Sequence, residues 1–127
     1  MSNEEQMEHE FIDLVDVLCA KHGFPPTQCP SDINPGWASI LDRMLKQLRV
    51  IEYSGEIAQV KEKLGTLRVY LSEMNKQADK IVAIAEAESE TTCQDCGDPG
   101  QLRAGGWLRT LCDPCQEKWR LQRGYAS

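Results

Sequence analysis

The pairs Cys93-Gln-Asp-Cys96 and Cys112-Asp-Pro-Cys115 each hold two residues between two cysteines, and fifteen residues separate the pairs. Two intervening residues let both sulfurs of a pair face one point from a single tight turn. Two such turns supply four thiolates, the tetrahedral set of a structural Zn²⁺, which keeps no open position for a reacting water. The spacing therefore predicts a closed zinc site that serves structure and not catalysis. Its expected ligands are Cys93, Cys96, Cys112 and Cys115.

Three other uses of these cysteines stay open, namely disulfides, a redox pair and iron in the same cage. A thioredoxin-like pair requires a helix start within a βαβ setting, and the chain offers two pairs and no such setting. The acidic stretch from Met1 to Glu10 lacks the basic and apolar regions of a signal peptide, and the longest apolar run is too short to cross a bilayer. We therefore expect a cytoplasmic protein without a membrane partner, where clustered cysteines bind metal more often than they form disulfides.

The residues between the two pairs predict the hairpin of a zinc ribbon. Residues 101–104 and 107–111 have the pattern of short strands, and Gly105-Gly106 supplies a two-residue turn. Gly97 follows the first pair, where a tight turn favours a residue that tolerates positive φ. Residues 116–124 are expected to form a short closing helix.

Upstream of the cysteines, apolar residues repeat at helical spacing in two segments. The first segment is 4–21, and Gly23 with the prolines after it ends the pattern. The second begins at Asn34-Pro35-Gly36, where Asn34 can cap and proline is tolerated at the first helical position. The apolar residues of the first helix are Met7, Phe11, Leu14, Val15 and Leu18, and those of the second are Trp37, Ile40, Leu41, Met44, Leu45 and Leu48.

Residues 57–62 and 66–72 predict a β-hairpin that turns at Leu64-Gly65. A third helix is expected over 73–90, capped by Ser72, with an acidic end that is solvated or frayed. Its expected buried residues are Met74, Ala78, Ile81, Val82 and Ala85, and its acidic end carries Glu86, Glu88 and Glu90. The sequence thus predicts an α+β protein, with helices packed around a β-hairpin in residues 1–90 and a zinc ribbon in residues 91–127.

Two segments resemble an uncharacterised family of small phage and bacterial proteins. The first reads Val60-Lys-Glu-Lys-Leu-Gly-Thr-Leu-Arg-Val-Tyr70. The second reads Cys93-x-x-Cys96-Gly-x-Pro-Gly100 and then Gly105-Gly106-Trp107-x-Arg-Thr-Leu-Cys112-Asp. Gly36-Trp37 followed by Leu41-Asp42 is also similar. The resemblance implies a phage or prophage origin and carries no known activity.

The chain departs from this family at a few positions. Relatives often have phenylalanine where Leu64 and Val69 stand, and some place histidine after the third ligand. Here Cys115 completes a set of four cysteines instead.

Charge limits the classes of partner. The formal net charge is −6, with −7 in residues 1–92 and +1 in residues 93–127. Proteins that bind the phosphate backbone of nucleic acids usually carry a strong basic footprint, and no such excess exists here. Arg103, Arg109, Lys118, Arg120 and Arg123, with Trp107 and Trp119, nevertheless form a candidate nucleic-acid face, weighed against an ordinary solvated basic surface.

Two further groups are weaker candidates. Cys19, His22 and Cys29 offer three ligands for a second metal site, but they lack a clear fourth ligand. We favour a buried Cys19 and a loop Cys29, because a free cysteine behaves as a small hydrophobe. Charges alternate along the hairpin at Lys61, Glu62, Lys63 and Arg68, which is typical of a solvent-facing strand surface and only a weak sign of a binding edge.

No Ser-His-Asp set, P-loop or dinucleotide fingerprint is present. We therefore expect a non-enzymatic, zinc-stabilised binding protein that inhibits or modulates a host macromolecule, with a host protein favoured as the partner. A nucleic-acid-binding regulator is the first alternative, and an enzyme of unknown class is the second. The sequence does not indicate an oligomeric state.

Overall fold

The computed structural model describes residues 13–105 and 107–122. They form helices and two antiparallel hairpins, which confirms the expected α+β class. The elements are α2 (Leu14–Lys21), the 3₁₀ turn η1 (Pro35–Trp37), α3 (Ala38–Val50), β1 (Ile57–Lys63), β2 (Thr66–Leu71), α4 (Lys76–Ser89), β3 (Gln101–Arg103), β4 (Arg109–Leu111) and α5 (Asp113–Gln122). Parts of the predicted helices, residues 4–12 and 123–124, lie outside the described residues.

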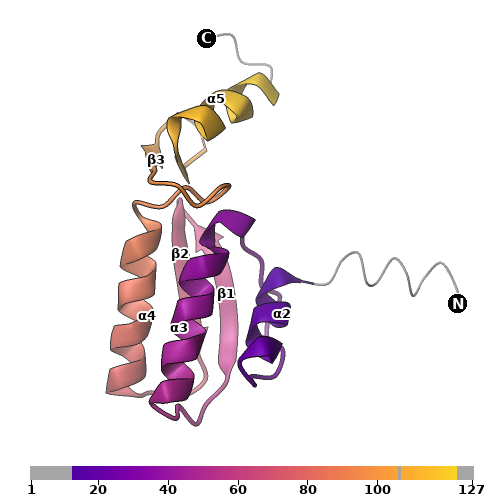
Figure 1. The fold of residues 1–127 in the computed structure, drawn as a ribbon, viewed down its shortest axis with the longest axis vertical. Helices are drawn as coiled ribbons and strands as arrows, with labels where there is room; N and C mark the ends of the chain where they lie inside the picture. The colour runs from indigo at the N-terminus through magenta and orange to yellow at the C-terminus, as the bar shows by residue number, and fades with distance from the viewer. Residues whose placement is uncertain (1–12, 106, 123–127) are drawn as a thin grey trace, which may run out of the picture.

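Helix α3 is the centre of the main hydrophobic core. Its apolar stripe is buried as the sequence predicts, and Trp37, just before it, is fully buried as well. Figure 1 shows α3 in front of the β1–β2 hairpin, with α4 along one side and α2 along the other. The core closes around this helix because its stripe faces the hairpin and both neighbouring helices. The buried residues of the stripe are Ile40, Leu41, Met44, Leu45 and Leu48.

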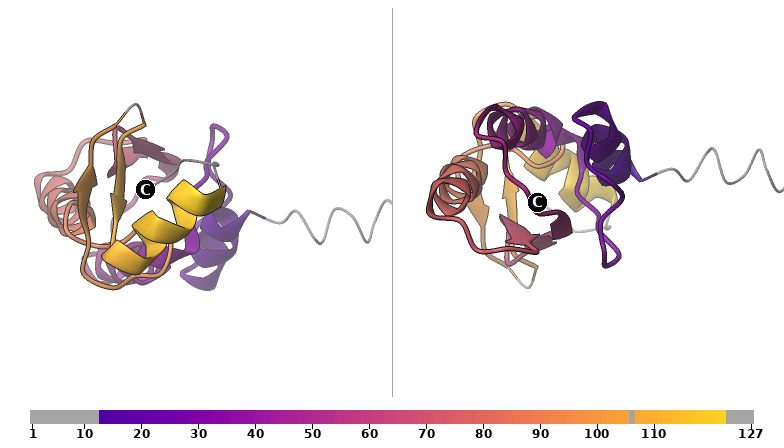
Figure 2. Two further views of the ribbon diagram at one scale, coloured as in Figure 1. Left: turned by 90° about the horizontal axis from the view of Figure 1, so that it is seen from above. Right: turned by 90° about the horizontal axis from the view of Figure 1, so that it is seen from below.

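The β1–β2 hairpin turns at two residues with positive φ, Leu64 at 55° and Gly65 at 81°. A two-residue turn of this kind matches the right-handed twist of the strands. Lys63 pairs with Thr66 beside the turn, and the register carries Val60, Leu67 and Val69 into the core. The alternate residues, Lys61 and Arg68 among them, point to the opposite face, as the charge pattern predicts. Figure 2 shows none of the described helices over that face.

Other parts of the chain cover both outer edges of this hairpin. The backbone N–H of Leu67 donates to Ser89 Oγ at 2.9 Å, and the N–H of Val69 donates to Glu86 Oε2 at 3.0 Å. On the other edge, the segment before η1 bonds to β1 through Cys29 N–H to the Ala58 carbonyl at 2.9 Å. An uncovered edge can recruit a strand from another chain. These contacts occupy the positions that such a strand would need.

Helix α4 continues to Ser89, so the expectation of a frayed end is wrong, whereas Glu90 after it is exposed to solvent as expected. Besides the Glu86 contact with β2, Glu88 forms an ion pair with Arg43 of α3. Glu86 and Glu88 therefore have partners on neighbouring elements, and these offset their unfavourable place at a helix C-terminus.

Two predicted helix caps are also wrong. Asn75, not Ser72, caps α4 by accepting from the Ala78 N–H at 3.0 Å, while the Ser72 hydroxyl accepts from the Glu56 N–H. Helix α4 thus begins at Lys76 and leaves Met74 exposed instead of buried. Asn34 makes no capping bond, and α3 follows the short η1 turn.

The C-terminal ribbon stacks on the turn end of the hairpin (Figure 1) and has a small cluster of its own. Thr110 Oγ1 donates to the Gly65 carbonyl at 2.7 Å and joins the two hairpins. Strand β4 begins at Arg109, later than predicted, and α5 begins at Asp113, three residues earlier than predicted. The division into residues 1–90 and 91–127 stays a prediction. The buried residues of the ribbon cluster are Cys93, Leu111 and Cys112.

Candidate metal centre

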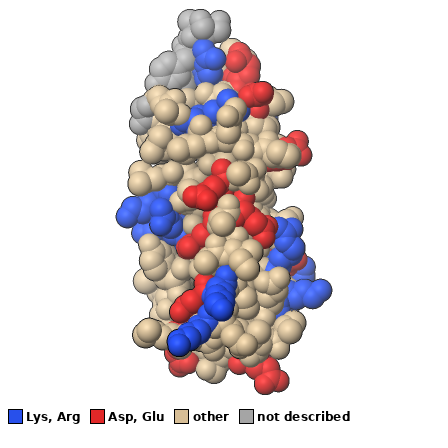
Figure 3. Space-filling view, turned by 90° about the vertical axis from the view of Figure 1, so that its left-hand side faces the viewer, with Lys and Arg blue, Asp and Glu red and all other residues tan. Residues whose placement is uncertain are grey.

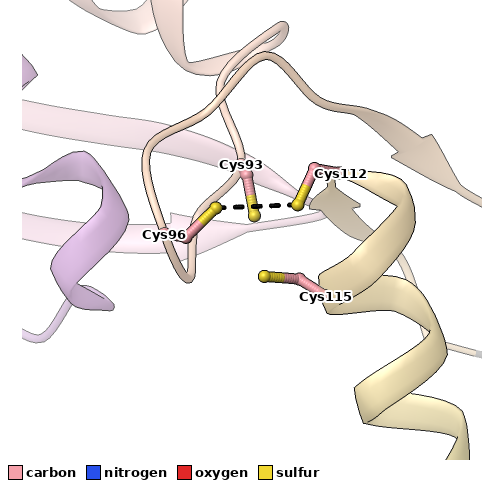
Figure 4. Close-up of side chains that lie close together, drawn as sticks. All are labelled: Cys93, Cys96, Cys112 and Cys115. Carbon is pink, nitrogen blue, oxygen red and sulfur yellow. Dashed lines mark hydrogen bonds between the residues drawn. The ribbon is translucent and has the colours of Figure 1, made fainter.

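The four predicted cysteines point toward one another (Figure 4), and their sulfur atoms all lie within 4.8 Å of one another. Cys96 Sγ and Cys112 Sγ are 3.6 Å apart, and none of the cysteines is in a disulfide. A tetrahedral Zn²⁺ with bonds of about 2.3 Å to sulfur holds its sulfurs about 3.8 Å apart. The donor set therefore fits one metal ion, and only small movements are needed to close around it.

Two different local structures present the ligands. Cys93 and Cys96 lie on a loop after α4, closed by the Gly97 N–H on the Cys93 carbonyl at 2.9 Å. Gly97 has a φ of 87°, which side-chain-bearing residues rarely adopt. Cys112 follows β4, and Cys115 lies in the first turn of α5. The short hairpin and the early start of α5 thus bring the second pair to the first.

Electrostatics distinguishes the four thiols. Burial opposes ionisation of Cys93, but backbone N–H groups of Cys112, Cys96 and Asp95 outweigh it and lower the pKa of Cys93 to about 7. Burial and the neighbouring sulfurs raise the pKa of Cys115. Crowded thiols cannot all ionise without a cation between them. A divalent ion removes this conflict, because metal ligation deprotonates coordinating thiols.

The first cysteine turn rests on η1, the short turn just before α3. The Gly36 N–H donates to the Gln94 carbonyl at 2.9 Å, and the indole Nε1 of Trp37 donates to the Thr92 carbonyl at 2.9 Å. A Cβ at Gly36 would collide with the backbone of Cys93 and Gln94. Spacing along the sequence does not predict this contact, although the Gly36-Trp37 pair in the resemblance was a signal for it.

Side chains extend the same contact. Asn34 Nδ2 donates to Asp95 Oδ1 at 2.8 Å, and Arg109 Nη2 reaches the same oxygen at 3.1 Å. Gln94, nearly fully buried, accepts from the Thr110 N–H through Oε1 at 3.0 Å. The loop between the first two ligands is thereby bonded to both η1 and β4.

The second metal site does not form from the described residues. Cys19 is buried in α2, Cys29 is exposed in a loop, and His22 Nε2 lies 2.7 Å from Asp42 Oδ1. The described part of the chain gathers metal-binding side chains in a group of three or more only at the four cysteines. The expected buried Cys19 and loop Cys29 are confirmed. Burial raises the pKa of the Cys19 thiol to about 11, which makes it unreactive.

The ribbon brings together most of the candidate nucleic-acid face. Arg103, Arg109, Arg120, Trp107 and Trp119 line a hollow of about 210 Å³ between the β3–β4 hairpin and α5. Lys118 is exposed on α5 outside this lining, and Arg123 lies outside the described residues.

Each described arginine of the hollow has an acidic partner. Arg103 pairs with Asp113 at 2.7 Å, Arg109 with Asp95 at 3.1 Å and Arg120 with Glu117 at 3.7 Å. Arg103 also donates twice to the carbonyl of Leu111, the residue before Cys112. Arg103 and Arg109 therefore join different segments of the ribbon, the Arg120 pair lies within α5, and the charge of all three is balanced locally.

Among the described helices, none has both the length and the apolar composition that a bilayer crossing requires. Comparison of the chain with models of protein families, with curated proteins and with solved structures finds no match in any of the three.

Proposed function

We propose that the chain is a non-enzymatic binding protein stabilised by Zn²⁺, and that it acts in a bacterial cytoplasm on a host macromolecule. The observation that carries the proposal is the closed group of four sulfurs, within 4.8 Å of one another. Four thiolates complete the coordination of zinc and leave no position for a substrate. The metal therefore serves to hold the ribbon in shape, since so small a segment buries too little apolar surface to fold alone.

Zinc is tested by metal analysis of protein purified without added metal. The expected result is close to one equivalent of zinc per chain and no visible colour. Iron in the same cage absorbs visible light, and two disulfides leave four fewer free thiols and no metal. Either result overturns the proposal. Cys29→Ser is the matched control, because this exposed cysteine lies outside the sulfur cluster and its loss leaves the zinc content unchanged.

The absence of catalysis is supported by where the shifted ionisable groups lie. Catalytic acids and bases have perturbed pKa values inside a cleft. In the described part of the chain, the resolved shifts belong to three of the four clustered cysteines, to buried Cys19 and to the carboxyls of Asp13 and Asp42. Asp13 caps α2, and Asp42 pairs with Lys21 and His22. Both carboxyl groups thus have structural roles.

A host protein is the partner that the resemblance to phage proteins and the net charge of −6 support. On the face seen in Figure 3, basic side chains form separate groups with acidic side chains between them, so this face offers no continuous basic track for a phosphate backbone. Affinity capture with tagged protein tests this class. A specific protein partner must stay bound after nuclease treatment, and capture that nuclease abolishes would contradict it.

Nucleic acid is the second candidate. One observation favours it, the group of basic residues on the uncovered face of the β1–β2 hairpin.

A further inference from the structure

The uncovered face of the β1–β2 hairpin carries three cations and an aromatic ring. We call Lys61, Lys63, Arg68 and Tyr70 the basic face. The register places Lys61 directly opposite Arg68, and the Lys61 ammonium lies 5.6 Å from the centre of the Tyr70 ring. Tyr70 is 46% exposed. The face therefore combines positive charge with an accessible aromatic ring.

This arrangement is unfavourable for the isolated protein. Like charges directly opposite each other on a sheet destabilise it. None of the described carboxylates forms an ion pair with Lys61, Lys63 or Arg68. The arginines of the ribbon hollow, in contrast, each have an acidic partner. An anionic ligand would supply the missing negative charge on the basic face.

A hollow of about 390 Å³ adjoins the basic face and continues it toward the ribbon. Lys61 belongs to both, and Trp107 and Arg109 line the hollow from the ribbon side. The Trp107 side chain is 56% exposed. Amide side chains of Asn34 and Gln59 also line the hollow. Their nitrogens donate to Asp95 and to the Pro30 carbonyl, and their oxygens can accept from the edge of a base.

We propose that the basic face and this hollow bind single-stranded nucleic acid. Phosphates lie on Lys61, Lys63 and Arg68, and one unstacked base enters the hollow beside Trp107. Two carboxylates, Asp32 and Glu62, also line the hollow and keep phosphate on the face outside it.

The same features favour single-stranded nucleic acid over an acidic protein segment and over a nucleic-acid duplex. An acidic protein segment would meet Asp32 and Glu62 in the hollow as like charges and has no base to stack on Trp107. A duplex keeps its bases stacked inside the helix, so it cannot fill the hollow, and its affinity would rest on three cations in a chain of net charge −6.

The probe is fluorescein-labelled dT15, titrated with zinc-loaded full-length protein while anisotropy is measured at several salt concentrations. For single strands, log K falls with log salt with a slope of about −0.7 for each phosphate that is neutralised. Three cations therefore predict a slope of about −2. A duplex of the same length should bind more weakly, and poly-L-glutamate should compete poorly.

Variants locate the site. Lys61→Ala and Arg68→Ala should each reduce the slope by about 0.7. Lys76→Ala and Lys80→Ala remove the same charge from exposed positions on α4 and should leave the slope unchanged. Trp107→Ala should weaken dT15 binding about 5- to 150-fold, the range for loss of one stacked base. Zinc content and circular dichroism verify that each variant is folded.

Absence of saturable dT15 binding in zinc-loaded protein at 50 mM salt overturns the inference. Binding that the Lys61, Arg68 and Trp107 variants do not alter also overturns it, since the site then lies elsewhere. Competition by poly-L-glutamate as strong as by unlabelled dT15 would assign the face to an acidic protein instead. The inference rests on the second candidate partner of the proposed function, and the two fail separately. Loss of dT15 binding with one zinc bound refutes only this site, whereas absence of zinc refutes the proposed function.

Discussion

The backbone N–H of Gly36 donates a hydrogen bond to the carbonyl oxygen of Gln94, 2.9 Å away. This bond joins η1, the turn just before the central helix α3, to the loop between Cys93 and Cys96. The two residues are far apart in the sequence, and each adjoins a member of a different hydrophobic cluster, Trp37 in the main core and Cys93 in the ribbon. The metal centre is thus attached to the core through backbone groups and not only through side chains.

Gly36→Ala should weaken this attachment. The added Cβ collides with the backbone of Cys93 and Gln94, which cannot rotate away as a side chain could. Overpacking of this kind costs about 1–3 kcal/mol of unfolding free energy. Urea unfolding of the zinc-loaded protein measures it, and zinc transfer to a chelator should be faster. Ser39→Ala, exposed on the next part of α3, is the control, and equal behaviour of the two variants would refute the argument.

Cys112→Ser should abolish zinc binding and unfold the ribbon while most helical signal remains. Metal binding supplies the folding free energy of so small a segment, whereas α3 and α4 are buried in the main core. Circular dichroism should retain its helical bands, and protease should cleave on the C-terminal side of α4. Global loss of helix would show instead that ribbon and core fold as one unit. That outcome would refute the predicted division into residues 1–90 and 91–127.

Ser89→Ala should destabilise the main core by about 1–3 kcal/mol. The Ser89 hydroxyl is fully buried, accepts from the Leu67 N–H and donates to the Glu86 carbonyl at 2.6 Å. Removal of the hydroxyl leaves a buried N–H without a partner. Thr91→Ala removes an exposed hydroxyl from the same region and should change the unfolding free energy by less than about 0.5 kcal/mol. Equal effects of the two substitutions would contradict this role.

Cys19 and Cys29 should differ in reactivity toward iodoacetamide at pH 8. Exposed Cys29 should be labelled rapidly, whereas Cys19 is fully buried and its pKa is raised to about 11. The folded state therefore favours the neutral thiol, and the associated stability is complete below the ordinary pKa of 9.0 and is lost as the pH rises toward 11. Mass spectrometry of labelled peptides measures both rates. Comparable rates in zinc-loaded protein would contradict the burial of Cys19.

Local patterns allowed much of the fold to be predicted. The stripe of α3 and the two cysteine pairs depend on spacing along the chain, and the turn at Leu64-Gly65 depends on one glycine. The helix caps were harder to predict, because spacing does not reveal which of two nearby polar residues is already bonded elsewhere. Ser72 and Asn75 can both cap a helix, and Ser72 is unavailable because its hydroxyl bonds the Glu56 N–H.

The contacts around the metal centre were harder to predict for a similar reason. Gly36 meets Gln94, and Thr110 meets Gly65, only after the chain has folded. Helix α5 begins at Asp113 although Pro114 follows, because proline is tolerated in a first helical turn. The start of α5 predicted from periodicity alone, residue 116, therefore lies three residues after the observed one.

The contacts of Ser89 and Glu86 with β2 act for a strand as an N-cap acts for a helix. In both cases a side-chain oxygen accepts from a backbone N–H that the regular structure leaves without a partner. A sheet cannot add a strand at an edge whose backbone N–H groups already have hydrogen-bond partners. The C-terminal half of α4 thus limits this sheet to two strands. As long as α4 stays folded, β2 cannot pair with a strand of another molecule, even at high protein concentration.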